Sequence, residues 1–158
     1  MTNRQCSSCT ACCEGWLTTK INGIQIKPGT PCVNCTKQGC KIYEKRPKNP
    51  CVSFKCAWLI EPDKFPEHMK PSKCGAIIVF SQWGDKGVVK ATPVGEKIPS
   101  DTLEWLMAFA REHSLPLMFN EHLFEDGKYI GLTKKLYGPQ SFIREEDTRI
   151  TPEDIMRF

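Results

Sequence analysis

Four cysteines lie within eight residues close to the amino terminus, in a CxxCxxCC run made of Cys6, Cys9, Cys12 and Cys13. Clustered thiols add little to a hydrophobic core, but as thiolates they are strong ligands for zinc, iron and iron-sulfur clusters. Cys6, Cys9 and Cys13 share one side at helical spacing, and in a loop each CxxC pair can hold one ion or cluster. The run therefore predicts a metal site.

A second group of thiols follows, and the chain has ten cysteines in all. The remaining six are Cys32, Cys35, Cys40, Cys51, Cys56 and Cys74. Pro47 and Pro50 keep the backbone irregular in this region, as expected where loops fold around a metal. Residues 41–46 predict a single helical turn that ends at Pro47.

An even number of cysteines also fits the disulfide framework of a small secreted protein. Residues 1–5 are mostly polar and lead directly into the first cysteines, without an apolar signal segment. No later apolar run has the length of a membrane span. We therefore expect a cytoplasmic protein with reduced thiols and no membrane partner, and we favour metal binding over disulfides.

The spacing leaves the identity of the metal open. Cys6, Cys9 and Cys12 have the spacing of bacterial ferredoxins, but Trp16 stands at the expected fourth position, which argues against a ferredoxin proper. The CxxC pairs at 6–9 and 32–35 resemble the halves of a four-cysteine zinc knuckle. Ten thiols allow two four-thiolate zinc centres, one iron-sulfur cluster with spare thiols, or a mixture.

Other polar residues are weaker candidates. His68, His113 and His122 stand alone, so we expect surface or helix-end positions rather than metal ligands. Arg46, near Tyr43, can donate hydrogen bonds to thiolate sulfurs and stabilise a negatively charged site. Alternatively, Arg46 packs under Pro47 and pairs with a neighbouring glutamate. We expect the two tryptophans in this half, Trp16 and Trp58, to shield the site.

The cysteine pattern is joined by the string CKIYEKRP at residues 40–47, followed by Cys51, Phe54 and Cys56. Over residues 6–58 it resembles the CxxCxxCC cysteine-cluster proteins, which carry a YkgJ-type zinc- or iron-chelating domain. The resemblance implies eight metal ligands: Cys6, Cys9, Cys12, Cys13, Cys32, Cys40, Cys51 and Cys56. A related motif in flagellin lysine N-methylases is associated with an iron-sulfur cluster. This association favours iron over zinc, with a [4Fe-4S] cluster as the form to test for.

Two features of the chain depart from that family. Three residues separate Pro47 from Cys51, where the family usually has two, and Cys35 stands where the family tends to have a bulky apolar residue. Cys74 also lies outside the pattern. The roles of Cys35 and Cys74 are therefore open.

The rest of the chain predicts a scaffold. Asn22-Gly23 and Asp126-Gly127 each predict a two-residue hairpin turn. Residues 76–80 and 88–91 predict two strands, of which the first, continuously apolar, should be central. A helix should begin after Pro99, capped by Ser100 or by an Asp101–Glu104 pair, and pack on the sheet. We expect residues 61–73 to form an exposed connection and residues 151–154 to begin a helix.

Together these features predict one α+β domain over residues 1–158, with 40% hydrophobic residues to build its core. An irregular cysteine-rich metal-binding portion, residues 6–58, should pack on a small antiparallel sheet with one or two helices, formed by residues 74–158. The net charge of +4 is spread along the chain, which argues against nucleic acid as a partner.

We therefore expect a protein that binds iron, as an Fe-S cluster, or zinc; a protein partner is left open. Two alternatives remain at this stage. One is a redox or group-transfer enzyme that uses the cluster, although the chain has no nucleotide-binding fingerprint. The other is a zinc-stabilised module for protein interaction or nucleic-acid binding.

Overall fold

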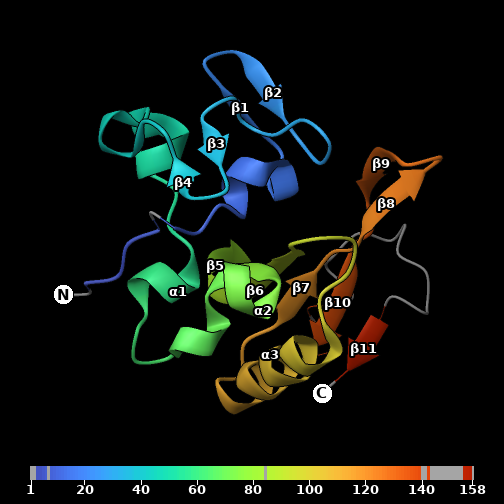
Figure 1. Cartoon of the computed structure of the whole chain (residues 1–158). Helices are drawn as coiled ribbons and strands as arrows, with labels where there is room; N and C mark the ends of the chain where they lie inside the picture. The colour runs from blue at the N-terminus through green and yellow to red at the C-terminus, as the bar shows by residue number, and fades with distance from the viewer. Residues whose placement is uncertain (1–2, 7, 84, 140–141, 143–154, 158) are drawn as a thin grey trace.

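A five-stranded sheet forms the centre of the C-terminal portion (Figure 1). The computed structural model describes residues 3–6, 8–83, 85–139, 142 and 155–157. The strand order is β11-β10-β7-β6-β5, with β5–β6 and β7–β10 antiparallel and β6–β7 and β10–β11 parallel. The strands are β5 (Ala76–Trp83), β6 (Lys86–Pro93), β7 (Leu117–Phe119), β10 (Lys135–Gly138) and β11 (Ile155–Arg157).

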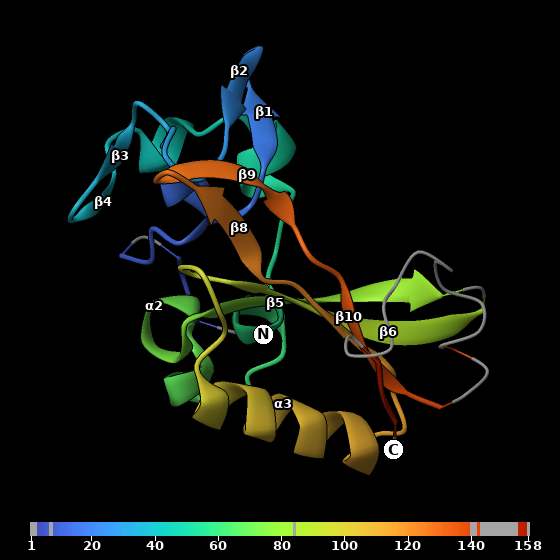
Figure 2. The same cartoon turned by 90° about the vertical axis from the view of Figure 1, so that its right-hand side faces the viewer.

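The main helix, α3 (Ser100–Glu112), lies along one side of this sheet, and the cysteine-rich portion lies on the other (Figure 2). Helix α3 begins after Pro99, as predicted, and buries Leu106, Phe109 and Ala110. The expected caps, Ser100 or Asp101 with Glu104, are wrong, because both Ser100 and Asp101 lie inside the helix and no side chain caps its start. Asp101 instead accepts a hydrogen bond from the N–H of Thr102 at 2.9 Å. The helix start expected at residues 151–154 lies outside the described residues.

The cysteine-rich portion consists of short, irregular pieces, as expected for loops folded around a metal. Its regular elements are two hairpins and three helical turns. They are the turn Cys12–Trp16, β1 (Thr19–Ile21), β2 (Ile24–Ile26), β3 (Cys35–Thr36), β4 (Gly39–Cys40), and the turns Tyr43–Lys45 and Lys48–Val52. The turn at Tyr43–Lys45 confirms the predicted helical turn before Pro47.

Both two-residue hairpin turns are confirmed. Asn22 and Gly23 have φ angles of 51° and 81°, and Ile21 faces Ile24 in the β1–β2 ladder. Asp126 and Gly127 join β8 (His122–Glu125) to β9 (Lys128–Leu132) in the same way, with φ angles of 51° and 76°. These positive angles are what a type I′ turn requires, and Asn, Asp and Gly adopt them most readily.

The expectation of an exposed connection over residues 61–73 is wrong. This segment follows α1 (Ala57–Ile60), forms a turn at Glu67–Met69 and leads into α2 (Pro71–Cys74). Phe65 and Met69 are 0% and 1% exposed. Two apolar side chains among charged neighbours are enough to anchor the segment, because each buries a large area against the core.

The expected central position of the first long strand is also wrong, because β5 is at one edge of the sheet. Its consecutive residues Ala76, Ile77 and Ile78 are all buried, so both faces of the strand are covered at this end. Helices α1 and α2 both contact β5. Burial on two faces, and not a central place, explains its continuous apolar sequence.

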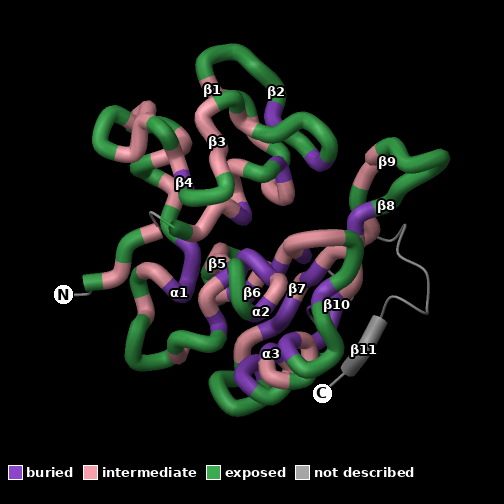
Figure 3. The backbone as a smooth tube through the Cα atoms, in the orientation of Figure 1, coloured by how far each residue is buried: buried purple, intermediate pink, exposed green. Residues whose placement is uncertain are grey.

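One hydrophobic core runs through both portions (Figure 3). It joins Ala57 and Trp58, which follow the last cysteine of the N-terminal group, to Ile77, Leu106 and Leu117 of the sheet and helix. The predicted α+β class is confirmed, and the cysteine-rich portion packs on the sheet. The sheet was expected to be antiparallel, but it also contains the parallel pairs β6–β7 and β10–β11. No helix in the described part of the chain is long and apolar enough to cross a membrane.

Candidate metal centre

All eight cysteines of the predicted ligand set line one cavity of about 310 Å³. They come from distant parts of the cysteine-rich portion and are Cys6, Cys9, Cys12, Cys13, Cys32, Cys40, Cys51 and Cys56. Cys35 and Cys74, the two thiols that the resemblance leaves outside the set, do not line it. All ten cysteines are free thiols.

Short hydrogen bonds and one glycine position these thiols. The N–H of Cys9 donates to the carbonyl oxygen of Cys6 at 2.9 Å. The N–H of Cys32 donates to the carbonyl oxygen of Cys13 at 2.8 Å, which joins the second group of cysteines to the CxxCxxCC run. Gly15 has a φ angle of 101°, and a Cβ atom there would lie 2.1 Å from the carbonyl oxygen of Lys27. Only glycine therefore allows the turn after Cys13 to lie against the backbone of Lys27, just after β2.

The vicinal pair divides the thiols into two groups. Burial raises the pKa of Cys12 well above its ordinary value, and the neighbouring Cys56, Cys9, Cys13 and Cys6 raise it further. Burial likewise raises the pKa of Cys13 to about 12, and its further neighbours are Cys35, Cys40, Cys32 and Cys51. Among the cavity thiols, Cys12 thus belongs with Cys6, Cys9 and Cys56, and Cys13 with Cys32, Cys40 and Cys51.

These raised pKa values describe thiols that repel one another when ionised in a poorly solvated space. A bound cation removes that repulsion, and thiolate is its preferred ligand form. Within the described residues, no three His, Cys, Asp or Glu side chains meet the geometry of a metal-ion site. The thiols surround a hollow and do not converge on a single point.

Arg46 and Tyr43 stand at the Cys6 side of the cavity, which fits the first of the two roles considered for Arg46. The Nη1 of Arg46 donates to the Cys6 sulfur at 3.3 Å, and the Tyr43 hydroxyl is 3.8 Å from the same sulfur. The guanidinium carbon of Arg46 lies 3.8 Å from the centre of the Tyr43 ring. In the described part of the chain no ion pair joins Arg46 to Glu44, so the expected pairing with a neighbouring glutamate is absent there.

The pKa values of this pair reflect their surroundings. Burial, followed by the hydrogen bond with Cys6, raises the pKa of Tyr43. Burial lowers the pKa of Arg46, but the charges of Tyr43 and Cys6 outweigh it and raise that pKa overall. Arg46 therefore stays positively charged beside the sulfur of Cys6.

Two buried donors remain unused around the cavity. The Arg46 Nε and the Trp58 Nε1 are buried without a hydrogen-bond partner among the described residues, and both residues line the cavity. An unsatisfied buried N–H group costs free energy. A centre rich in negatively charged sulfur offers the kind of acceptor that these donors lack, so the residues fit such a group.

Apolar side chains complete the wall, among them Leu17, Ile21, Phe54 and Trp58. The shielding role expected of Trp58 is consistent with this position. Trp16 does not line the cavity; its ring lies 5.3 Å from that of His122. Apolar walls lower the local dielectric constant and so strengthen interactions between thiolates and a cation.

None of the three histidines lines the cavity. His68 and His113 are exposed, as expected, but a surface position is wrong for His122, which is 2% exposed. Its Nδ1 lies 2.6 Å from the carbonyl oxygen of Gly95, and its Nε2 lies 3.2 Å from that of Trp16. His122 therefore connects the sheet portion to the turn that carries Cys12 and Cys13.

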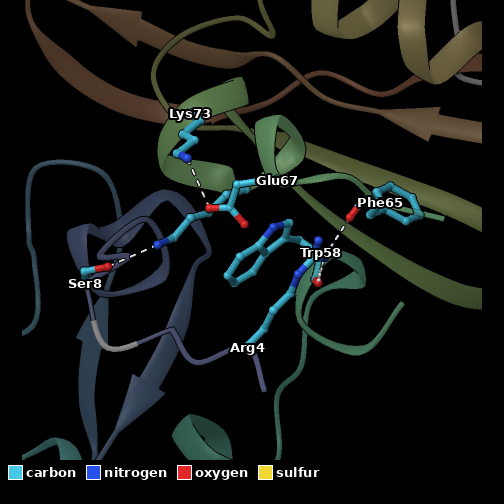
Figure 4. A network of polar contacts seen from close by, with 7 residues as sticks. Arg4, Ser8, Trp58, Phe65, Glu67 and Lys73 are labelled. Atoms are coloured by element: carbon cyan, nitrogen blue, oxygen red, sulfur yellow. Dashed lines mark hydrogen bonds and ion pairs between the residues drawn. The ribbon is translucent and has the colours of Figure 1, made fainter. Parts of the chain in front are cut away.

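The sequence reasoning also missed a basic clamp on Trp58 (Figure 4). The Nη1 of Arg4 donates to the carbonyl oxygens of Trp58 and Phe65, at 2.6 Å each. Arg4 and Lys70 lie 4.7 and 5.1 Å from the Trp58 ring centre, and the Lys70 amine is 3.1 Å from the Ser8 hydroxyl. These contacts hold the CxxC segment against α1, and no local sequence pattern indicates them.

Cys74 has a structural environment. It is 5% exposed, and its sulfur lies 3.4 and 3.3 Å from the carbonyl oxygens of Met69 and Ala76. Burial raises its pKa to about 11. Cys74 therefore behaves as a small core residue with a weak donor.

Comparisons of the chain with protein-family models, with curated proteins and with solved structures found no match. The resemblance to the YkgJ-type domain thus stays a prediction that rests on the cysteine motifs.

Proposed function

We propose that this protein binds iron, as an iron-sulfur cluster, or zinc, through the eight cysteines around the cavity. The observation that carries the proposal is that all eight predicted ligands, spread over residues 6–56, line the same hollow. A hydrophobic core alone gains nothing from gathering eight thiols around one hollow, where burial and neighbouring thiols raise the pKa of Cys12 and of Cys13. Metal ligation gives the arrangement a physical reason.

The division of the thiols suits two centres of four ligands each. Cys12 with Cys6, Cys9 and Cys56 forms one set, and Cys13 with Cys32, Cys40 and Cys51 forms the other. Four thiolates are the usual ligand number of both a structural zinc ion and a [4Fe-4S] cluster.

Arg46 supports a centre with net negative charge. A donor to a ligand sulfur stabilises the thiolate form and, in a cluster, tunes the reduction potential. The reduced thiols that such a centre needs are maintained in the cytoplasm, which is where we place the protein.

An enzyme remains a second candidate, favoured by one observation. A further cavity of about 250 Å³ adjoins the first and shares Cys6, Tyr43, Arg46 and Cys51 with it. Its wall also carries Arg4 and Lys55, and no carboxylate among the described residues. A small anionic substrate placed there would lie beside the metal centre, as redox or group-transfer chemistry requires.

The test is elemental analysis with an absorption spectrum, on protein purified without air. We expect iron with an equal amount of acid-labile sulfide, and brown colour, or else zinc without colour. Reversible bleaching by dithionite would support redox chemistry. Protein purified without air that contains neither iron nor zinc, with all its thiols reduced, would refute the proposal.

Matched variants test the ligand set. We expect Cys12→Ser and Cys13→Ser each to lower the metal content, because each removes a thiol from one of the two sets. Cys35→Ser, outside the cavity, should leave the metal content unchanged. Equal loss in all three variants would contradict the assignment.

A further inference from the structure

The β3–β4 hairpin places Cys35 directly opposite Cys40. The ladder pairs Cys35 with Cys40 and Thr36 with Gly39, around the two-residue loop Lys37–Gln38. The N–H of Lys41 donates to the carbonyl oxygen of Asn34 at 2.8 Å. Asn34 and Lys41 are therefore a hydrogen-bonded pair, next to the Cys35–Cys40 pair. Because hydrogen-bonded and non-hydrogen-bonded pairs alternate, Cys35 and Cys40 occupy a non-hydrogen-bonded position.

That position brings the two side chains close together. At non-hydrogen-bonded pairs the Cα atoms are about 4.5 Å apart and the side chains lie on the same face. Disulfides join residues whose Cα atoms are about 4.4–6.8 Å apart. The pair can therefore be bridged without moving the backbone far. The Thr36 hydroxyl donates to the Gly39 carbonyl oxygen at 2.7 Å, which holds the hairpin in this register.

The two thiols differ in what else they face. Cys40 lines the metal cavity, whereas Cys35 does not. Both are partly accessible to solvent. Cys35 is thus a thiol without a place in the proposed ligand set, paired with a thiol that belongs to it.

We propose that Cys35 and Cys40 form a reversible disulfide that withdraws Cys40 from the metal centre. The disulfide itself rests only on the hairpin geometry, and its effect on metal rests on the proposed function. The pair is a redox modification site: with reduced thiols the centre holds its metal, and under oxidising conditions it loses a ligand.

The oxidant required is a small-molecule disulfide of the glutathione class. One protein thiolate attacks a sulfur of this disulfide, which forms a mixed disulfide and releases one small thiol. The other protein thiolate then attacks the protein-side sulfur and releases the second small thiol. The two protons of the protein thiols pass to the two released thiols, and a dithiol reductant reverses the reaction.

Cys32 is the competing partner. The N–H of Cys35 donates to the Cys32 carbonyl oxygen at 3.0 Å, which closes the turn between these two cysteines. Cys32 lines the cavity as Cys40 does. The ladder register, however, sets only Cys35 and Cys40 face to face.

The first experiment treats the reduced protein, as purified without air, with oxidised glutathione and maps its tryptic peptides. Lys37 lies between the two cysteines, so a disulfide joins the peptides at residues 21–37 and 38–41. Because the larger peptide also contains Cys32, the variants Cys32→Ser and Cys35→Ser identify the partner. We expect the linked peptides to persist in Cys32→Ser and to disappear in Cys35→Ser.

The opposite pattern, or no linked peptides in the wild type, would overturn the proposal. The linked peptides are detected without any measurement of metal, so this outcome is distinguishable from failure of the proposed function.

The second experiment adds the same oxidant to the metal-loaded protein and follows metal release with a chromogenic chelator. We expect the wild type to release metal and Cys35→Ser to retain it, with equal metal content before oxidation. A lower starting content in Cys35→Ser would show that Cys35 is a ligand, and equal release from both proteins would show that the disulfide has no effect on the centre. Either result would overturn the switch.

Discussion

At the scale of single residues, Arg46 places a positive charge directly beside a cavity thiol. It donates to the Cys6 sulfur at 3.3 Å and packs on Tyr43. The sequence by itself left open whether Arg46 donates to a thiol sulfur or pairs with Glu44. That Cys6 would be its partner, 40 positions away, was beyond any local pattern.

We expect Arg46→Gln to weaken metal binding about 10–100-fold, the usual effect of removing a donor to a metal ligand. The variant removes the positive charge beside Cys6 and its hydrogen bond. Competition with a chelator of known affinity measures the change. Arg111→Gln, at an exposed position on α3, is the matched control and should bind as the wild type does. Equal affinities for both variants would contradict a role for Arg46 at the centre.

Cys74 leads to a prediction about pH. Its pKa is about 11 in the folded protein against an ordinary value of 9.0, because the thiol is buried. Below pH 9 both folded and unfolded chains hold this proton; between pH 9 and 11 only the unfolded chain releases it. Stability is therefore full below pH 9 and falls as the pH rises through this window.

We expect the metal-free, reduced protein to lose free energy of unfolding between pH 9 and pH 11, and Cys74→Ala to lose less over the same range. Urea denaturation at several pH values measures both. The comparison uses the change with pH within each protein, because the substitution itself alters packing. Identical pH dependence in the two proteins would contradict burial of this thiol.

At the scale of elements, the turn after Cys13 depends on close contact between two main-chain segments. Gly15 has a φ angle of 101° and no room for a Cβ atom beside Lys27. Gly23, in the β1–β2 turn, also has a positive φ angle, of 81°, but nothing lies within 4 Å of its missing Cβ. Alanine substitutions at the two glycines therefore distinguish backbone strain, which both would have, from a steric clash, which only Gly15 would have.

We expect Gly15→Ala to destabilise the protein more than Gly23→Ala, and to lower metal content as well. Both substitutions carry the strain of a positive φ angle, about 1–2 kcal/mol, but only the first forces the Lys27 backbone to move. Urea denaturation and metal analysis of the two variants provide the comparison. Equal effects would show that the contact with Lys27 is unimportant.

Elements differed in how far they could be predicted. The hairpin turns at Asn22-Gly23 and Asp126-Gly127 and the helix after Pro99 were predicted because their signals lie within a few consecutive residues. The place of β5 at the sheet edge was not, because an apolar strand covered on both faces looks the same at an edge as at the centre.

At the scale of the whole molecule, the cysteine-rich portion and the sheet share one core, yet they are held together differently. The sheet contains one long ladder, the eight residue pairs between β5 and β6. The cysteine-rich portion has hairpins of two or three residues per strand. Its order should therefore depend on metal, whereas that of the sheet should depend on its own packing.

We expect metal removal to increase amide hydrogen exchange mainly in residues 6–56, and much less in β5, β6 and β7. Exchange measured by mass spectrometry on metal-loaded and metal-free protein tests this difference peptide by peptide. The surface peptide of α3 that contains Arg111 serves as an internal reference. A uniform rise over the whole chain would mean that metal supports both portions equally.

The sequence by itself determined the local turns, the main helix and the α+β class, and it named the thiols proposed as metal ligands. Turn preferences, periodicity and ligand chemistry depend on residues near one another or on residue type. Only the tertiary structure decided that eight thiols line one cavity, that Cys35 instead faces Cys40, and that His122 is buried against the Trp16 carbonyl. These features depend on how distant segments pack, and packing depends on the shape and burial of the whole chain.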